Sequence, residues 1–315
     1  MQLESLLQLL GDPIQSPDEE IFDLFAQDLP SQNLGFVDAK ATTLELTIAD
    51  RDLTIHQSPS ILSSTRAGGT TGAVVWRITP LFAQWLCRSS NPLFAHAILS
   101  PSSLAIELGC GISGIVALCL APRIARYVLT DQPYVAKLVL QNLAENESTT
   151  TTARSKSSSA KAKKGGSSSS SKHAKSSGTA AAAAPGQIAF TPLDWETDEV
   201  TAALTGSSSA KSFDLVVACD CIYNEALVEP FVSACADICR LRAVEQQQEQ
   251  EQGDTVLQPS VCVVAQQLRN PDVFGAWLTC FARSFRVWRV PDSMLDDGLE
   301  SNSGFVIHIG VLRED

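Results

Sequence analysis

The chain has 315 residues, 44% of them hydrophobic, and a formal net charge of −12, which allows one large domain or two ordinary ones with a sizeable core. No run of residues approaches the roughly eighteen apolar residues that a membrane span needs, and the first residues lack a basic region followed by an apolar run. The composition therefore argues against a membrane partner and against a secretory signal.

The nine cysteines lie mostly inside apolar runs, none forms a Cys-x-x-Cys pair, and the four histidines are scattered. A structural zinc site would need tighter clusters. We therefore expect no metal, buried free thiols in a reducing compartment, and a cytoplasmic location that can extend to the nucleus.

The charge is distributed unevenly along the chain. Residues 147–186 hold seven Lys or Arg and one Glu, which leaves 16 basic against 34 acidic residues elsewhere. The strongly acidic remainder argues against direct binding to nucleic acid. It suits a basic macromolecular partner that the charge would steer, and it equally suits a protein that is acidic only for solubility.

In chain order, residues 1–70 are expected to form an N-terminal extension, and residues 71–315 a single α/β domain. Within the extension, 43–48 and 53–55 alternate apolar and polar residues, which predicts a β-hairpin. Strand-like apolar runs then alternate with helix-like segments. Strands are expected at 104–108, 127–130, 188–193, 213–218 and 261–265. Helices are expected at 80–87, 112–121, 135–142, about 226–241 and about 271–281.

This alternation predicts a mostly parallel sheet with helices on both faces. The last two runs, 285–290 and 305–311, have no helical pattern between them and predict a terminal antiparallel pair. Two tracts interrupt the domain. Residues 147–186 lack aromatic residues and are expected to be a disordered insertion, and 245–256 are expected to be a polar loop.

A glycine loop follows the first core strand. Gly109, Gly111 and Gly114 have the spacing of a dinucleotide-binding fingerprint between a strand and a helix. Glycines let the backbone approach a cofactor, and the helix amino terminus offers free N–H groups. Asp131 ends the next strand, where a carboxylate can accept hydrogen bonds from both hydroxyls of a ribose.

Two interpretations compete for this loop, a nicotinamide enzyme and a methyltransferase. Glu107 places a carboxylate two residues before the first glycine, and neither Cys110 nor its neighbours is a Lys or Arg that could meet a pyrophosphate. S-adenosyl-L-methionine carries a positively charged sulfonium and an ammonium. Acidic groups near the loop therefore favour this cofactor over one with a pyrophosphate. Together with the terminal hairpin, these residues predict a class I, seven-β-strand, Rossmann-like methyltransferase fold.

Further candidates follow the third and fourth core strands. Asp194 can accept from an adenine amino group while Trp195 packs against the ring, although both also suit a turn. Cys219, Asp220 and Tyr223 lie at the strand edge where ligands bind. Asp220 can hold an incoming ammonium while Tyr223 shapes the channel, or Asp220 can cap the next helix.

Two further candidates have a less specific sequence signal. Trp76 either lies against the cofactor or fills the core, and Arg269 can pair with a nearby carboxylate.

With these residues assembled, the chain resembles the seven-strand protein lysine methyltransferases, and within them the fungal ribosomal lysine N-methyltransferase branch. The similarity covers about residues 43–312 apart from the two tracts. The segments that carry it are 53–60, 69–76, 107–114, 129–131, 193–195, 218–224 and 264–269. The Asp-x-x-Tyr element, here Asp220 to Tyr223, is its most specific mark, whereas the long basic insertion departs from the family's pattern.

The resemblance implies that Trp76, Gly109 to Gly111, Asp131, Trp195 and Cys219 line the cofactor site. It also implies methylation of a lysine on a large-subunit ribosomal protein, a basic substrate that the acidic surface would recruit. We expect the protein to be a monomer. Two alternatives stay open: methylation of a small molecule, another protein or RNA, with the charge arguing against RNA, and a cofactor-binding module without catalysis.

Overall fold

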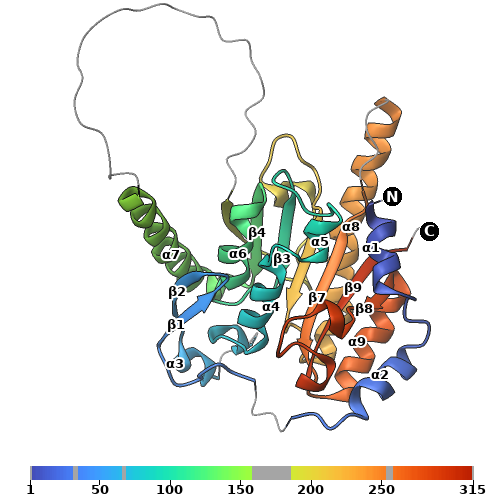
Figure 1. The fold of residues 1–315 in the computed structure, drawn as a ribbon, viewed down its shortest axis with the longest axis horizontal. Coiled ribbons are helices and arrows are strands. Elements are labelled where there is room, and N and C mark those ends of the chain that lie inside the picture. The colour runs from blue at the N-terminus through green and yellow to red at the C-terminus, as the bar shows by residue number, and fades with distance from the viewer. Residues whose placement is uncertain (1, 31–34, 66–68, 158–185, 253–257, 314–315) are drawn as a thin grey trace, which may run out of the picture.

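A seven-stranded sheet forms the centre of the molecule, in the order β5-β4-β3-β6-β7-β9-β8. The computed structural model describes residues 2–30, 35–65, 69–157, 186–252 and 258–313 (Figure 1). The strands are β3 (Leu104–Leu108), β4 (Arg126–Asp131), β5 (Gln187–Pro192), β6 (Leu215–Cys219), β7 (Val261–Gln267), β8 (Phe285–Arg289) and β9 (Phe305–Leu312). Strands β3 to β7 pair in parallel, and β9 is antiparallel to both β7 and β8. The predicted mostly parallel sheet with a terminal antiparallel pair is confirmed.

Helices cover both faces of this sheet, because successive side chains of each strand point to opposite faces. Val217 and Val263 belong to one hydrophobic cluster and Val216 and Val264 to the other. The first cluster includes residues of α1 (Gln2–Leu10), α4 (Ile78–Cys87), α5 (Pro92–Ala95), α6 (Ile115–Leu120) and α7 (Ala136–Ser157). The second includes residues of α2 (Pro17–Phe25), α8 (Val228–Gln252) and α9 (Pro271–Ser284).

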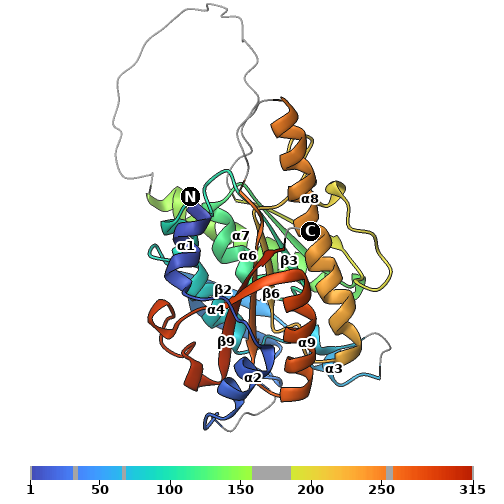
Figure 2. The ribbon, with the colours of Figure 1, turned by 90° about the vertical axis from the view of Figure 1, so that its right-hand side faces the viewer.

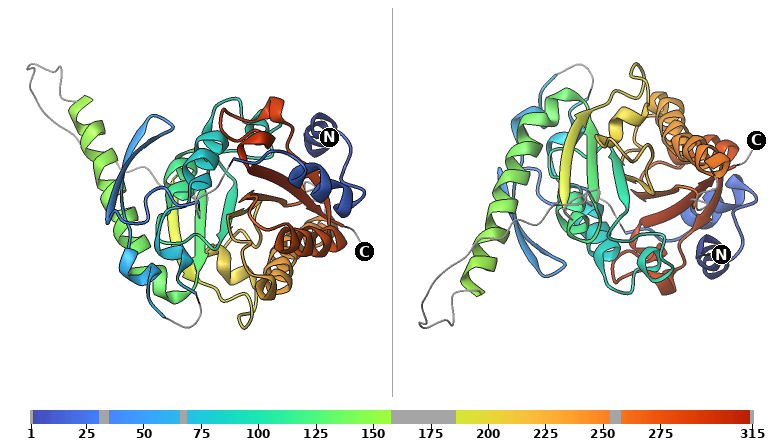
Figure 3. Two further views of the ribbon diagram at one scale, coloured as in Figure 1. Left: turned by 90° about the horizontal axis from the view of Figure 1, so that it is seen from below. Right: turned by 90° about the horizontal axis from the view of Figure 1, so that it is seen from above.

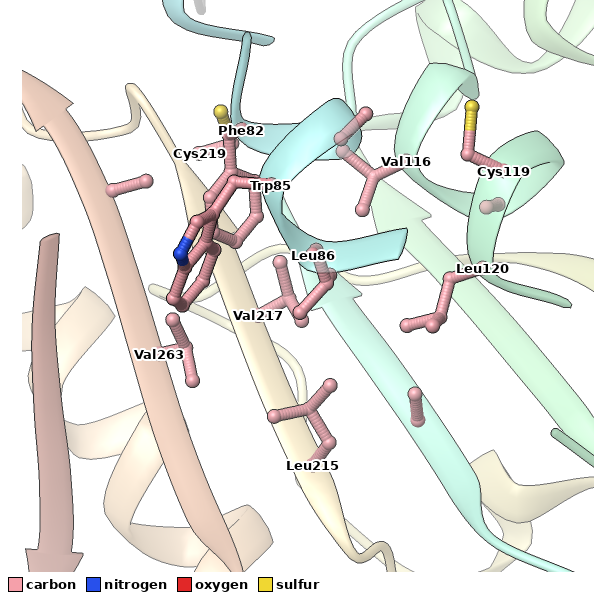
Figure 4. Packing of buried hydrophobic residues seen from close by; sticks show 14 of the residues in the cluster. Phe82, Trp85, Leu86, Val116, Cys119, Leu120, Leu215, Val217, Cys219 and Val263 are labelled. Atoms are coloured by element: carbon pink, nitrogen blue, oxygen red, sulfur yellow. The ribbon is translucent and has the colours of Figure 1, made fainter. Parts of the chain in front are cut away.

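Helix α4 packs directly over the middle of the sheet. Its Phe82 and Trp85 are fully buried and lie over Val217 and Val263 (Figure 4). The Trp85 indole N–H donates to the carbonyl of Met294 at 2.7 Å. This packing fixes the segment that leads into α4, which carries Trp76.

Two helices extend further than expected. Helix α7 continues to Ser157, into the tract 147–186 for which we predict disorder, and residues 158–185 lie outside the described residues. Helix α8 continues to Gln252, into the predicted polar loop 245–256, of which 253–257 lie outside the described residues. Within the described residues, no helix is both long and apolar enough to cross a membrane.

The predicted N-terminal hairpin is present as β1 (Thr43–Ile48) and β2 (Arg51–His56), which pair antiparallel. Side chains of α7 bind the free edge of β2. Asn142 accepts from the main-chain N–H of His56 at 2.8 Å and donates to its carbonyl at 2.9 Å. Asn146 makes the same pair of bonds with Thr54, at 3.0 and 2.9 Å. The short helix α3 (Pro59–Leu62) follows the hairpin.

Helices α1 and α2, which no pattern predicted, lie at the opposite end of the sheet from the hairpin (Figure 3). Helix α2 packs against α9, whereas the buried leucines of α1 belong to the cluster on the other face of the sheet (Figure 2). The Trp288 indole N–H donates to the carbonyl of Gly11 at 3.1 Å, and Ile14 donates to Val287 on β8 at 2.7 Å. The described helices and strands of the N-terminal extension thus pack against both ends of the sheet.

Candidate active site

A cavity lies at the carboxyl ends of β3, β4 and β6, where an open parallel sheet binds its ligands. The segment 69–79, which contains a 3-10 turn (Thr71–Ala73) and the start of α4, forms another wall. Eleven of the thirteen candidate residues, all except Gly114 and Arg269, line this cavity: Trp76, Glu107, Gly109, Cys110, Gly111, Asp131, Asp194, Trp195, Cys219, Asp220 and Tyr223. The structure therefore brings them together, while the role of each stays a prediction.

The glycine loop has no room for side chains at two of its positions. Gly109 and Gly111 both have positive φ, 68° and 59°. A Cβ at Gly109 would lie 2.7 Å from the sulfur of Cys221, and one at Gly111 would lie 3.0 Å from the carbonyl of Gly72. The N–H of Ile112 donates to that same carbonyl at 2.9 Å. The segment that contains Gly72 therefore crosses directly over the loop.

Gly114 does not line the cavity, unlike the other predicted cofactor-binding residues. It has a φ of 60° just before α6, and a Cβ there would lie 3.0 Å from Cδ2 of Leu143 on α7. Its place in the structure is the close contact between α6 and α7. This contact gives Gly114 a packing role between the two helices, and its contact with the cofactor stays a prediction.

Two acids stand beside the loop, and burial raises the pKa of each. The pKa of Asp131 rises to about 6, although its carboxylate accepts N–H bonds from Gly111 at 2.8 Å and Gln132 at 2.6 Å that lower it. Burial raises the pKa of Glu107 to about 8, against the lowering effect of the Tyr127 hydroxyl, which donates to it at 2.9 Å. A cation bound nearby would favour the ionised form of both groups.

Trp195 forms the wall on the other side of Gly109. Its six-membered ring would contact a Cβ at Gly109 at 3.2 Å, and the indole packs on Phe231 with ring centroids 5.2 Å apart. The buried indole N–H has no hydrogen-bond partner among the described residues. Asp194 lines the cavity and also holds a turn, since its carboxylate accepts from the N–H of Glu196 at 3.0 Å.

Asp220 is held in a strained and fully paired arrangement. Its φ is 60°, and its side chain is 1% exposed. Arg269 donates to both carboxylate oxygens, at 2.7 and 2.5 Å, and the N–H of Gln267 adds a third bond at 3.3 Å. The predicted pairing of Arg269 with a nearby carboxylate is therefore present, and the carboxylate is that of Asp220. The alternative that Asp220 caps the following helix is wrong, because Asn224 caps it by accepting from Ala226.

Tyr223 and Cys219 both line the cavity, Tyr223 at its exposed side and Cys219 at a buried position. Tyr223 is 44% exposed, and its hydroxyl lies 3.5 Å from where a Cβ of Gly69 would be. Cys219 is buried, with its sulfur 3.7 Å from the hydroxyl of Thr79. Tyr223 and Gly69 therefore face each other at the cavity.

Several lining residues were not singled out from the sequence: Gly69, Gly72, Thr79, Gln132, Tyr134 and Cys221. The signal that could have found the first two is the pair of glycines shortly before Trp76. All nine cysteines are free thiols. Within the described ranges, no three His, Cys, Asp or Glu side chains form a group that could hold a metal ion.

The comparisons with known proteins agree with this geometry. A model of the family described as lysine methyltransferase matches residues 55–161 and 173–252, more than half of the chain. The chain belongs to the lysine methyltransferase family. The family's methyl donor is S-adenosylmethionine, and the cavity fits it, because it offers an unpartnered indole N–H and two acids whose ionisation a cation would favour.

Individual relatives match at moderate identity. Ribosomal lysine N-methyltransferase 5 of Zygosaccharomyces rouxii is 31% identical over 196 residues, 58% of this chain and 58% of that protein. The protein of the same name from Vanderwaltozyma polyspora is 27% identical over 275 residues, 75% of this chain and 82% of that protein. A diaminohydroxyphosphoribosylamino-pyrimidine deaminase of Schizosaccharomyces pombe is 31% identical over 137 residues.

The deaminase match covers 43% of this chain and 33% of that protein. The chain thus spans a third of one of these relatives and somewhat over half of another.

Proposed function

We propose that this protein is an S-adenosylmethionine-dependent protein-lysine N-methyltransferase that acts on a ribosomal protein of the large subunit. One observation carries the proposal: the glycine loop with Asp131 and the Asp220–Tyr223 element line the same cavity. We call the glycine loop with Asp131 the cofactor wall of this cavity, and the Asp220–Tyr223 element its acceptor wall. A direct transfer needs both walls in one cavity, because the reacting atoms must lie about 3 Å apart. The family and the names of the yeast relatives support the lysine acceptor and the ribosomal target.

S-adenosylmethionine supplies a methyl group activated by its sulfonium. On this proposal, Asp131 accepts from the ribose hydroxyls, Trp195 packs against the adenine, and Glu107 faces the cationic methionine end. The closely packed Gly109 and Gly111 leave the main chain free to approach the cofactor. Trp76 and Cys219 complete the lining of the cavity in which the cofactor and the acceptor meet.

The acceptor lysine must lose its proton before it can attack. With an ordinary pKa near 10.4, this costs about 4.6 kcal/mol at pH 7. On this proposal, desolvation of the ammonium in the acceptor channel lowers that pKa. Tyr223, facing Gly69, sets the width of the channel and thereby the number of methyl groups that fit.

The hypothesis that the Asp220 carboxylate itself holds the amine does not suit its surroundings. Both of its oxygens already accept from Arg269. The side chain is 1% exposed while the whole residue is 8% exposed, so that its accessible part is the main chain. We therefore assign the contact with the amine to the main chain of Asp220 and to Tyr223.

The setting of the enzyme is part of the proposal. The acidic composition outside 147–186 supports a basic protein substrate rather than direct binding to nucleic acid. The free thiols support a cytoplasmic protein that can also enter the nucleus. We propose that it acts as a monomer.

The deciding experiment offers the purified protein methyl-tritiated S-adenosylmethionine and ribosomal proteins from cells that lack the enzyme. One discrete labelled band, absent with Asp131→Ala, is the expected result and names the substrate. Cofactor binding in a calorimeter without any labelled protein would contradict the proposal and favour a small-molecule acceptor or a non-catalytic module.

A further inference from the structure

Arg269 lies between the acceptor wall of the cavity and the N-terminal segment. Its guanidinium donates to both oxygens of Asp220 and lies over the Trp76 ring, 4.6 Å from the ring centroid. A second bond from its Nη2 reaches the side-chain oxygen of Gln267 at 2.8 Å. Asp220 and Trp76 both line the cavity, whereas Arg269 itself is not among the lining residues. Arg269 therefore acts on the cavity through its neighbours.

The same guanidinium leaves no space for a side chain at Gly35. A Cβ there would lie 2.1 Å from the side-chain oxygen of Gln267 and 2.7 Å from Nη2 of Arg269. Next to it, Phe36 pairs with Trp76 in an isolated bridge, with their ring centroids 4.5 Å apart. The Trp76 ring is thus held by contacts with both Phe36 and Arg269.

The charged and titratable groups around Asp220 set the electrostatic environment of an amine that binds beside it. The thiols of Cys219 and Cys221 flank it in sequence, and burial raises the pKa of both, so that they stay neutral. On the neighbouring strand β3, the charge of Glu107 also raises the pKa of both thiols, while burial raises the pKa of Glu107 itself to about 8. From the segment after β7 comes the guanidinium of Arg269, whose positive charge balances the carboxylate of Asp220.

We propose that Arg269 is a positioning residue for methyl transfer, which neutralises Asp220 beside the acceptor amine and fixes Trp76 in the cavity wall. This inference rests on the proposed lysine methylation. An unbalanced carboxylate beside the amine would favour the ammonium form, which cannot attack, because an opposite charge within a few ångströms raises the pKa of an amine. Arg269 holds the carboxylate of Asp220 in place and neutralises its negative charge.

The test is the pH dependence of kcat with the protein substrate at saturation. Arg269→Met leaves the negative charge unbalanced, and we expect the midpoint of the profile to rise by about one pH unit. Asp220→Asn leaves the positive charge unbalanced, and the midpoint falls. Arg269→Met combined with Asp220→Asn returns the midpoint to the wild-type value. Arg269→Lys, which keeps the charge, leaves the midpoint in place and lowers kcat through the looser hold on Trp76.

The chain offers a matched control at the other end of β6. Arg242 donates to Asp214 at 2.7 Å, and its side chain is 7% exposed. Arg242→Met breaks a similarly close Arg–Asp pair at the start of the same strand, so it lowers the melting temperature without moving the pH profile. Cofactor binding in a calorimeter verifies that each variant is folded.

Single variants that move the midpoint in the same direction would overturn the inference, as would an Arg269→Met profile that equals the wild type. An equal shift in Arg242→Met would overturn it too. Should Arg269→Met fail to fold, Asp220→Asn and Arg269→Lys still decide, the first by its downward shift and the second by its unchanged midpoint. If the wild-type protein labels no protein substrate, the proposed function itself is wrong and the inference falls with it.

Discussion

At the scale of single residues, the carboxylate of Asp131 changes its charge near neutral pH. Burial raises its pKa to about 6 while two main-chain N–H bonds oppose the rise. Below that pH it gains a proton and loses acceptor capacity for the ribose hydroxyls. We therefore expect the Kd for S-adenosylmethionine to rise as pH falls through about 6, by up to about tenfold per pH unit. Calorimetry between pH 5 and pH 7 measures it, and Asp131→Asn should bind weakly with no step near pH 6.

Glu107 gives a second pH dependence with a different midpoint. Its pKa of about 8 makes it mostly protonated at neutral pH without cofactor, and a bound cation favours its ionisation. Cofactor binding at pH 7 should therefore release protons, seen as a binding enthalpy that varies with the ionisation enthalpy of the buffer. Glu107→Gln should reduce this release. An unchanged release in Glu107→Gln would contradict the assignment.

The same raised pKa has a consequence for stability, with a definite sign. Because the folded pKa of Glu107 lies above its ordinary value of 4.5, its contribution is fully present below about pH 4.5 and is lost as pH rises through about 8. Each difference of one in pKa corresponds to about 1.4 kcal/mol. The melting temperature without cofactor should fall between those pH values, less steeply in Glu107→Gln. Asp131 contributes in the same direction between about 4 and 6.

At the scale of elements, the hairpin is held by amide side chains rather than by a third strand. Asn142 bonds both main-chain groups of His56 and also donates to the carbonyl of Ile112 at 2.8 Å. Asn142→Ala leaves these buried groups unpaired, so we expect a loss of about 2–3 kcal/mol in the free energy of unfolding. Denaturant titration measures it, and hydrogen exchange should quicken in β2. Leu140→Ala, at a 51% exposed position on the same helix, should change little.

Gly35 allows a test of the contact between the N-terminal segment and Arg269. Gly35 and Gly11 both have positive φ, 89° and 83°, but nothing lies within 4 Å of a Cβ at Gly11. Alanine at either position suffers the left-handed backbone strain of about 1–2 kcal/mol. Only Gly35→Ala also displaces Gln267 and Arg269, so it should be the less stable variant and should lower kcat. Equal stabilities and rates would show that the segment is not tightly packed there.

The core elements could be predicted from the sequence, because buried parallel strands are nearly continuous apolar runs. Strand β3 begins and ends at the predicted residues, and β6 and β7 are buried throughout. Helices α1 and α2 were not predicted: they are short, and their partners on β8 and β9 are distant in sequence. The ends of α7 and α8 were misjudged because polar and small residues can extend a helix that needs no apolar face.

The site was predictable to the extent that it follows strand ends. Asp131 and Asp220 each directly follow or end a strand, which places them at one edge of the sheet. Spacing alone did not separate Gly114, which packs against Leu143, from the two glycines that line the cavity. Nor did it show that Asp220 takes a positive φ and gives its carboxylate to Arg269, because that pairing depends on three-dimensional contacts across β6 and β7.

At the scale of the whole molecule, the acidic charge outside 147–186 predicts salt-dependent recognition of a basic substrate. Raising the salt concentration from about 50 mM to about 300 mM screens charges at distances beyond roughly 6 Å. We expect the KM for the protein substrate to rise on the order of threefold or more, while the KM for the cofactor, bound in a cavity, changes little. Equal changes in both constants would show that surface charge does not recruit the substrate.

The contact between the first helices and the last strands has a consequence for how the protein is made. Gly11 accepts its bond from Trp288, 277 residues later in the chain. At about 5–20 residues per second, a ribosome takes roughly 14–55 s to deliver that partner. Throughout that interval the apolar faces of α1 and α2 have no sheet to cover. We therefore expect the segment that contains α1 and α2 to offer a binding site for chaperones until β8 and β9 have been synthesised.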